Sequence, residues 1–370
     1  MKEWIKGMDV SSLLEVERCG GRFYDHGTAG DAMDILKSYG TNLIRLRLWN
    51  DPFDESGNSY GGGGNDIETT LTLARRAKEK GIEWFLDFHY SDFWTDPGKQ
   101  ILPKAWRGMG EKELCRSVYD YTAATLKRCR EEGVLPSIVS VGNEISNGLL
   151  WPIGKVPAYD KIARLVSAGI RAVRDTAPEI SVMIHLDNGG SHELYQRWFD
   201  HYLDNGGEAF EYIGLSYYPF WHGTLQMLQD NMNDLALRYQ KELILAEVST
   251  AYTMEDYQRY EKLPPDKRKG MAAGPGLAGR APFPMTPEGQ ADFMKKIMEI
   301  LLRVPGRRGK GFCYWEPAWI PVPGSGWASE EAIAYMGEKG PGGNEWANQA
   351  LFDYEGNALP ALEAIRDFTV

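Results

Sequence analysis

A single (β/α)8 barrel (a TIM barrel, class α/β) is the fold that the sequence predicts, and three observations agree on it. Short apolar runs alternate with amphipathic stretches in eight strand-then-helix units along the 370 residues. Such alternation is typical of a parallel sheet with helices between its strands. The chain exceeds the roughly 250 residues of a typical barrel by an amount that long loops explain. No change of composition marks a second domain, so we expect residues 1–370 to form one barrel domain.

The expected elements follow from apolar periodicity and from capping residues. Asp66, for example, is a predicted helix N-cap, and Gly81 is expected to end the same helix. The predicted strands are residues 6–10, 42–49, 82–89, 139–144, 180–185, 211–218, 243–247 and 311–315. The predicted helices are residues 31–40, 66–81, 111–132, 160–176, 192–204, 225–239, 288–303 and 358–368.

Two long segments follow the last two predicted strands. Residues 254–286 and residues 319–357 are rich in glycine, proline and charged residues. Loops at the carboxyl ends of barrel strands carry the binding site in this fold class. We therefore expect both segments to shape a site rather than to act as linkers.

Two glutamates close apolar strands and are the first candidates for chemistry. Glu144 follows a β-branched run, and Glu247 ends a similar run about one hundred residues later. On the fourth and seventh strands of a barrel, the two side chains would face each other across one rim. Cleavage of a glycosidic bond needs such a pair, because one acid protonates the leaving oxygen while a second carboxylate attacks the anomeric carbon or activates water. Sequence spacing does not choose between retention and inversion.

Two arginines alternate with apolar residues in the second predicted strand. Arg45 and Arg47 therefore share one face of that strand. If this face points into the barrel, the guanidinium groups must meet carboxylates, since an unpaired buried charge is very costly. An ordinary structural role as ion-pair partners of these arginines is the alternative interpretation of Glu144 and Glu247.

Aromatic residues gather at or just beyond the strand ends. The chain holds 12 tryptophans, more than a core of this size needs, and sugars pack their C–H faces on aromatic rings. Core packing explains part of this set, but it does not explain the concentration at strand ends. The candidates for contact with a saccharide are Trp49, Trp94, Trp151, Tyr217, Tyr218, Trp221, Trp315 and Trp319.

A metal site is the competing chemistry. His89, His185, Asp87 and Asp187 lie near the ends of the third and fifth strands and have the chemistry of ligands for a divalent ion. The first strand carries no His-x-His pair, and hydrogen bonding is the expected role of each histidine. We therefore predict no metal ligands.

The charge balance limits the classes of partner. The formal net charge is −11, which argues against nucleic acid and against an anionic membrane surface. A neutral substrate fits better. No run approaches the ~20 apolar residues of a membrane span, and the first residues do not form a secretory signal. As the sequence stands we expect a cytoplasmic monomer, or a secreted one if a signal peptide has been removed.

The motifs around these residues resemble one family over almost the whole chain, in order. They are residues 6–13 (KGMDVSSL), 45–52 (RLRLWNDP), 87–99 (DFHYSDFWTDPGK), 141–144 (VGNE), 216–223 (SYYPFWHG), 246–247 (AE) and 314–321 (YWEPAWIP). This set resembles the endo-β-1,4-galactanases of glycoside hydrolase family 53. The resemblance implies a retaining barrel enzyme that cleaves β-1,4-galactan, the side chain of type I arabinogalactan in pectin, or its oligosaccharides.

The resemblance also implies roles for individual residues. Glu144 matches the acid/base and Glu247 the nucleophile of the family. Asn143 matches the residue that bonds the 2-hydroxyl of the sugar, and Arg45 matches the arginine that keeps the nucleophile ionised. The residues that match the lining of the same subsite are His89, Tyr217 and Trp315.

The chain departs from the family in two segments. Bacterial relatives commonly have Thr-Asn-Asn-Gly after the catalytic glutamate, whereas residues 145–148 read Ile-Ser-Asn-Gly here. Many relatives carry an Asp-x-Asp-x-His-x-Asn calcium stretch after the seventh strand, whereas Glu255, Asp256 and Asp266 do not have that spacing here. We therefore expect no cofactor. Two alternatives to the hydrolase remain, a galactan-binding barrel without catalysis and a metal-dependent barrel hydrolase.

Overall fold

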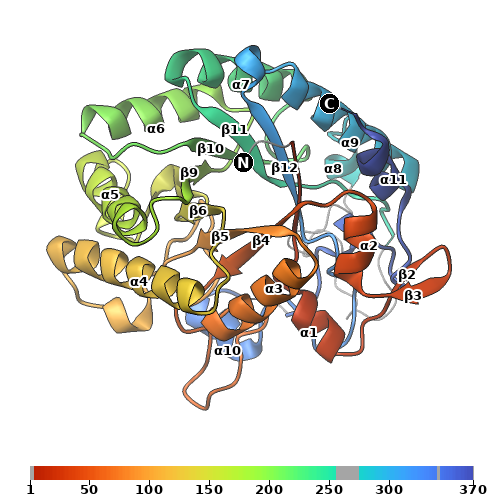
Figure 1. Cartoon of the computed structure of the whole chain (residues 1–370), viewed down its shortest axis with the longest axis horizontal. Helices are drawn as coiled ribbons and strands as arrows, with labels where there is room; N and C mark the ends of the chain where they lie inside the picture. Colours follow the sequence, from red (N-terminus) through yellow and green to blue (C-terminus); the bar gives the residue numbers. More distant parts are fainter. Residues whose placement is uncertain (1–3, 256–274, 340–341, 370) are drawn as a thin grey trace.

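Eight parallel strands close into a barrel, and helices surround it (Figure 1). The computed structural model describes residues 4–255, 275–339 and 342–369. The strand order around the barrel is β1-β12-β11-β10-β9-β6-β5-β4, so the first strand lies between the last strand and the second barrel strand. The predicted (β/α)8 barrel is confirmed.

The barrel strands match the eight predicted ones within a few residues at each end. They are β1 (Ile5–Asp9), β4 (Leu43–Leu48), β5 (Glu83–Phe88), β6 (Ile138–Val141), β9 (Ser181–Leu186), β10 (Tyr212–Tyr217), β11 (Glu242–Val248) and β12 (Gly309–Trp315). The predicted helices correspond to α2 (Ala32–Ser38), α3 (Ile67–Glu79), α4 (Glu111–Glu131), α5 (Tyr159–Thr176), α6 (His192–Asp204), α7 (Leu225–Tyr239), α9 (Pro287–Leu302) and α11 (Pro360–Asp367). As predicted, the Asp66 side chain accepts a hydrogen bond from the Thr69 N–H at the start of α3.

The barrel interior changes from apolar to charged along the strands. On β4, the inward positions are Leu43, Arg45 and Arg47 in turn, and on β5 Phe85 is followed by Asp87. A side chain at every second position of a strand points inward, so each strand contributes to successive layers. The apolar layer at the amino ends of the strands is formed by Ile5, Leu43, Phe85, Ile138, Met183, Tyr212, Ile244, Ala246 and Cys313. The charged layer above it carries the candidate site.

The loops hold elements that the sequence pattern did not reveal. A hairpin of β2 (Phe23–Asp25) and β3 (Thr28–Gly30) follows the helix α1 (Leu13–Arg18). A second antiparallel pair, β7 (Gly148–Leu149) and β8 (Gly154–Lys155), follows β6. These strands are two or three residues long, too short to show an alternating pattern.

The two long segments predicted as loops contain structure of their own. Within residues 319–357, Ser329 caps the helix α10 (Glu330–Met336), and part of this segment borders the cleft described below. Within residues 254–286, the short helix α8 (Pro275–Ala278) precedes α9. Asp256 and Asp266, which bear on the calcium prediction, lie outside the described residues. No helix in the described ranges is long and apolar enough to cross a membrane.

Candidate active site

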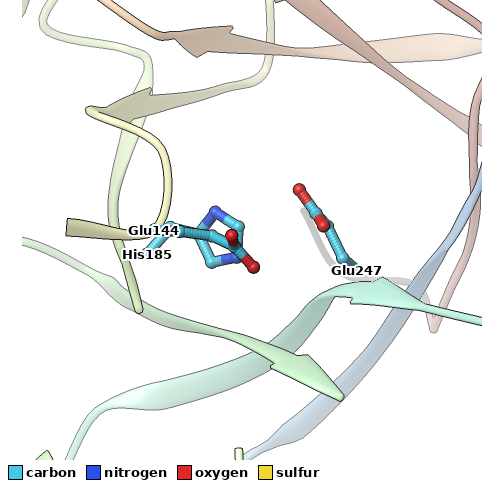
Figure 2. A group of neighbouring side chains, drawn as sticks. All are labelled: Glu144, His185 and Glu247. Carbon is cyan, nitrogen blue, oxygen red and sulfur yellow. The ribbon is translucent and has the colours of Figure 1, made fainter. Parts of the chain in front are cut away.

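Glu144 and Glu247 meet at the carboxyl ends of the strands, where Figure 2 shows their side chains facing each other across a gap. Glu144 lies three residues beyond β6 and Glu247 lies in β11. One oxygen of each carboxylate lies within 4.8 Å of the other and of a ring nitrogen of His185. The backbone is irregular at both glutamates. Glu144 has a left-handed φ of 48°. Near Glu247, the pairing register of β11 shifts against both neighbouring strands, β10 and β12.

The guanidinium group of Arg45 connects Glu247 to the barrel interior. Its Nη2 donates to Glu247 Oε1 at 2.8 Å and to Asp87 Oδ2 at 2.8 Å. The same nitrogen donates to Asn143 Oδ1 at 2.9 Å, while Nη1 donates to Asp9 Oδ2 at 2.5 Å. Arg45 is fully buried, so its charge is compensated entirely by these groups. The sequence-based expectation that an inward arginine meets carboxylates is confirmed.

The surroundings separate the two glutamates electrostatically. Burial raises the pKa of Glu144 well above its usual range, and the negative charge of Glu247 raises it further. Burial also raises the pKa of Glu247, but Arg45 and the hydroxyl of Tyr218 lower it. That hydroxyl donates to Glu247 Oε2 at 2.6 Å. Because only Glu247 has a cation beside it, Glu247 ionises first and Glu144 holds the proton.

Two buried histidines border this pair as neutral groups. Burial lowers the pKa of His89 despite the nearby carboxylate of Asp87, whose Oδ2 lies 3.2 Å from His89 Nε2. Burial and the charge of Arg45 lower the pKa of His185 to about 3. His185 Nε2 lies 2.8 Å from the hydroxyl of Ser216. Neutral imidazoles add no positive charge beside the pair, so Arg45 is the cation that stabilises ionised Glu247.

The four residues weighed as metal ligands do not form one cluster. Among the described residues, the group with the spacing for a metal ion joins His185 to Glu144 and Glu247 instead. Of the three residues weighed for calcium, Glu255 lies within the described part of the chain and Asp256 and Asp266 lie outside it, so the calcium prediction stays a prediction.

Aromatic rings form the walls of a cleft of about 390 Å³ above the carboxylates. Trp315 lies at the centre of these rings, 4.5 Å from Trp346 and 6.0 Å from Trp94 between ring centroids. These rings come from the loop after β5, the end of β10, and β12 with the segment that follows it. The aromatic residues of the lining are Trp94, Tyr218, Trp315, Trp319, Trp327 and Trp346. His89 and Asn143 also line the cleft, as their predicted role requires.

Three residues predicted to touch a substrate lie elsewhere. Tyr217 points away from the cleft, because its ring stacks on Phe293 of α9 and its hydroxyl donates to the Gly223 carbonyl. Adjacent side chains of a strand face opposite sides, so Tyr218 takes the inward position. Trp49 is fully buried behind Trp94. Arg45 lies beneath the carboxylates and contacts Glu247 rather than the open cleft.

Two further tryptophans lie outside the lining of the cleft. Trp221 is 41% exposed, with its ring 6.1 Å from that of Trp346. The ring of Trp151 is covered on one face by the Lys155 ammonium, 3.9 Å from its centroid. Trp221 thus extends the aromatic surface beyond the cleft.

The prediction of site residues missed several groups that line the cleft. Trp327 and Trp346 come from the long segment after β12, in which no pattern indicated which side chains turn inward. Lys99 and Glu338 join across the cleft margin, with Lys99 Nζ 2.6 Å from Glu338 Oε1. Lys99 lies within one of the quoted motifs, but its partner could not be identified from the sequence.

Known proteins resemble the chain along its full length. The family model for glycosyl hydrolase family 53 matches residues 5–365. An endo-beta-1,4-galactanase of Bacillus subtilis (strain 168) is 37% identical, over 99% of this chain and 86% of that protein. An arabinogalactan endo-beta-1,4-galactanase of Cellvibrio japonicus (strain Ueda107) is 32% identical, over 96% of this chain and 89% of that one.

A solved structure agrees with the family match and with the two relatives. The GH53 catalytic domain of Ignisphaera aggregans superposes with a TM-score of 0.89 at 38% identity, covering 98% of this chain and 96% of that one. A family match over nearly all residues, on a barrel whose two glutamates meet at one rim, leads to a single assignment: the chain belongs to glycosyl hydrolase family 53.

Proposed function

We propose that this protein is an endo-acting, retaining hydrolase of β-1,4-galactan, with Glu247 as nucleophile and Glu144 as acid/base. The observation that carries the proposal is the pair of carboxylates whose oxygens approach within 4.8 Å. Retaining enzymes hold their carboxyl groups about 5–5.5 Å apart, whereas inverting enzymes need about 6.5–9.5 Å to admit a water. The relatives named as galactanases support the choice of polysaccharide.

The first step forms a covalent intermediate. A Glu247 oxygen bonds to the anomeric carbon of the galactosyl unit while the bond from that carbon to the glycosidic oxygen breaks. Glu144 gives its proton to the departing oxygen, which leaves as the free hydroxyl of the second fragment. Arg45 and Tyr218 hold Glu247 in place during the attack through bonds of 2.8 and 2.6 Å.

The second step returns the enzyme to its starting state. Glu144, now a carboxylate, removes a proton from a water molecule whose oxygen bonds to the anomeric carbon. The ester bond to Glu247 breaks, and Glu247 leaves as a carboxylate that Arg45 stabilises. Formation of the glycosyl ester removes the negative charge of Glu247, so the pKa of Glu144 falls when it must act as a base.

Product analysis with linear β-1,4-galactan tests the proposal. An endo-acting enzyme releases a range of oligosaccharides and lowers the viscosity before many reducing ends appear. Galactose as the sole early product would contradict the endo mode. Binding without new reducing ends would indicate the galactan-binding barrel instead, and activity lost to a chelator and restored by zinc would indicate the metal-dependent alternative.

A further inference from the structure

A second arginine, Arg47, lines the cleft, and its function is not explained by the two carboxylates. Arg47 follows Arg45 on the inward face of β4 and is 1% exposed. Its Nη1 lies 3.2 Å from Asp9 Oδ1, and its Nη2 lies 2.6 Å from Glu316 Oε1. Asp9 also binds Arg45, but Glu316 binds neither Arg45 nor the nucleophile. The Arg47–Glu316 pair is therefore linked to Arg45 only through Asp9 and makes no direct contact with Glu247.

Glu316 is held in an uncommon conformation to reach this arginine. It is the first residue after β12, it is fully buried, and its φ is 51°. Left-handed backbone is unfavourable for a residue with a side chain and is kept where the surroundings require it. Ser12 fixes the carboxylate from the far side, with its N–H donating to Oε1 and its hydroxyl donating to Oε2. Glu316 thus reaches Arg47 as a fixed anchor.

The guanidinium group of Arg47 lies over two rings of the aromatic wall of the cleft. Its Cζ lies 4.5 Å from the ring centroid of Trp94 and 5.4 Å from that of Trp315. The two rings come from different strand ends and are tilted by 47° to each other. Trp94 has a second attachment, because its indole N–H donates to the Trp327 carbonyl at 2.9 Å. Arg47 is therefore a common contact of two rings that line the cleft.

We propose that Arg47, anchored by Asp9 and Glu316, is a positioning residue that fixes the planes of Trp94 and Trp315 and so shapes the sugar-binding wall beside Glu247. The inference rests on the proposed function, since it assigns a role within that site. Arginine suits the task because a planar fork can bind two carboxylates while its face contacts aromatic rings. A lysine ammonium is a point charge and cannot do both.

A merely structural ion pair would affect stability but not the binding of the sugar. The test is therefore kinetics on linear galactan with Arg47→Lys, which retains the charge, and Glu316→Gln, which retains the shape. We expect Arg47→Lys to raise KM about tenfold or more, which corresponds to the loss of one good ring contact with the sugar. We expect kcat to fall less than threefold, because Arg45, Glu144 and Glu247 keep their contacts.

The effect of Glu316→Gln separates the two roles further. If Glu316 acts through Arg47, this variant raises KM less than Arg47→Lys does, and the double variant is no worse than Arg47→Lys alone. Arg238→Met is the matched control, since Arg238 also lies over an aromatic ring, that of Tyr239, but on the outer helix α7. This control should leave both constants unchanged.

Two results would overturn the inference. One is an unchanged KM in Arg47→Lys, or a loss confined to kcat. The other is a crystal structure of Arg47→Lys in which the planes of Trp94 and Trp315 are the same as in the wild type. If wild-type protein left galactan intact, that result would overturn the proposed function. The crystal structure of Arg47→Lys would still test whether Arg47 fixes the planes of the two rings.

Discussion

Glu144, the proposed acid/base, illustrates how single residues are placed at the site. Its φ of 48° is reached through Gly142, whose φ of 91° only glycine adopts easily. Asn143, between them, accepts from Arg45 and donates to the Thr95 carbonyl. Left-handed backbone in a residue other than glycine is concentrated at functional positions. Three successive residues after β6 therefore have distinct tasks: Gly142 allows the turn, Asn143 binds Arg45, and Glu144 holds the proton.

Removal of either glutamate should produce a different kinetic signature. Glu247→Ala should abolish hydrolysis, and azide should restore part of the activity on an activated aryl galactoside with inverted configuration, because azide then replaces the missing nucleophile. Glu144→Ala should lose about 10²–10⁴-fold on galactan but far less on the aryl substrate, whose leaving group needs no proton. The configuration of the glycosyl azide is measured by NMR. Retained configuration with Glu247→Ala would contradict the assignment of the nucleophile.

The alkaline limb of the pH profile should depend on Asp187. Burial, the charge of Glu247 and then the charge of Asp187 raise the pKa of Glu144. Asp187→Asn removes one negative charge, so the pKa of Glu144 falls and its proton is lost at lower pH. We expect the alkaline limb of kcat/KM to move to lower pH by up to about one unit. Asp200→Asn on the outer helix α6 is the control, and an alkaline limb that stays in place in Asp187→Asn would contradict the argument.

At the scale of the elements, the barrel strands and the helices between them could be predicted, but the structure within the loops could not. Each barrel strand is an apolar run between a helix and a polar residue, and that pattern is local to the sequence. The sequence did not decide whether Arg45 points into the barrel, because the pattern of β4 does not show which of its two faces is the inner one. Tyr217 and Tyr218 were both candidates, and the register of β10 decides that Tyr218 enters the cleft. Trp346 was missed because its position depends on contacts between loops distant in sequence.

One glycine should decide whether the loop after Glu144 forms. Gly148 begins β7 with a φ of 89°, and a Cβ on it would lie 1.8 Å from the Gly154 carbonyl oxygen. Gly148→Ala should therefore separate β7 from β8, lower the free energy of unfolding by about 3 kcal/mol or more, and reduce activity. Gly206 is the matched control. Its φ is 73°, and a Cβ added to it would meet no non-neighbouring atom within 4 Å.

The control separates backbone strain from steric conflict. Gly206→Ala should cost only the strain of the left-handed backbone, about 1 kcal/mol. Urea unfolding measures both values, and hydrolysis of galactan measures the activity. Equal losses in the two variants would contradict the role assigned to the contact between β7 and β8.

At the scale of the whole molecule, compensation of buried charge joins the two ends of the chain. The arginines of β4 bind Asp9 of β1, Asp87 of β5 and Glu247 of β11, and Arg47 also binds Glu316 just after β12. Loss of a partner from a buried pair costs about 3–5 kcal/mol. Closure of the barrel and assembly of the site are therefore one event. The single domain predicted for residues 1–370 stays a prediction that this coupling favours.

The same arrangement affects how the protein is made. Ribosomes synthesise Arg45 and Arg47 about two hundred residues before Glu247 and still longer before Glu316. Until those residues emerge, Asp9 and Asp87 are the acidic partners available to the arginines of β4. Early burial of β4 would therefore stabilise a nascent chain little, because two of the carboxylates that compensate its arginines are still missing. Sealing of the barrel is therefore deferred until the segment that carries Glu316 has been synthesised, and the hydrolytic centre forms only then.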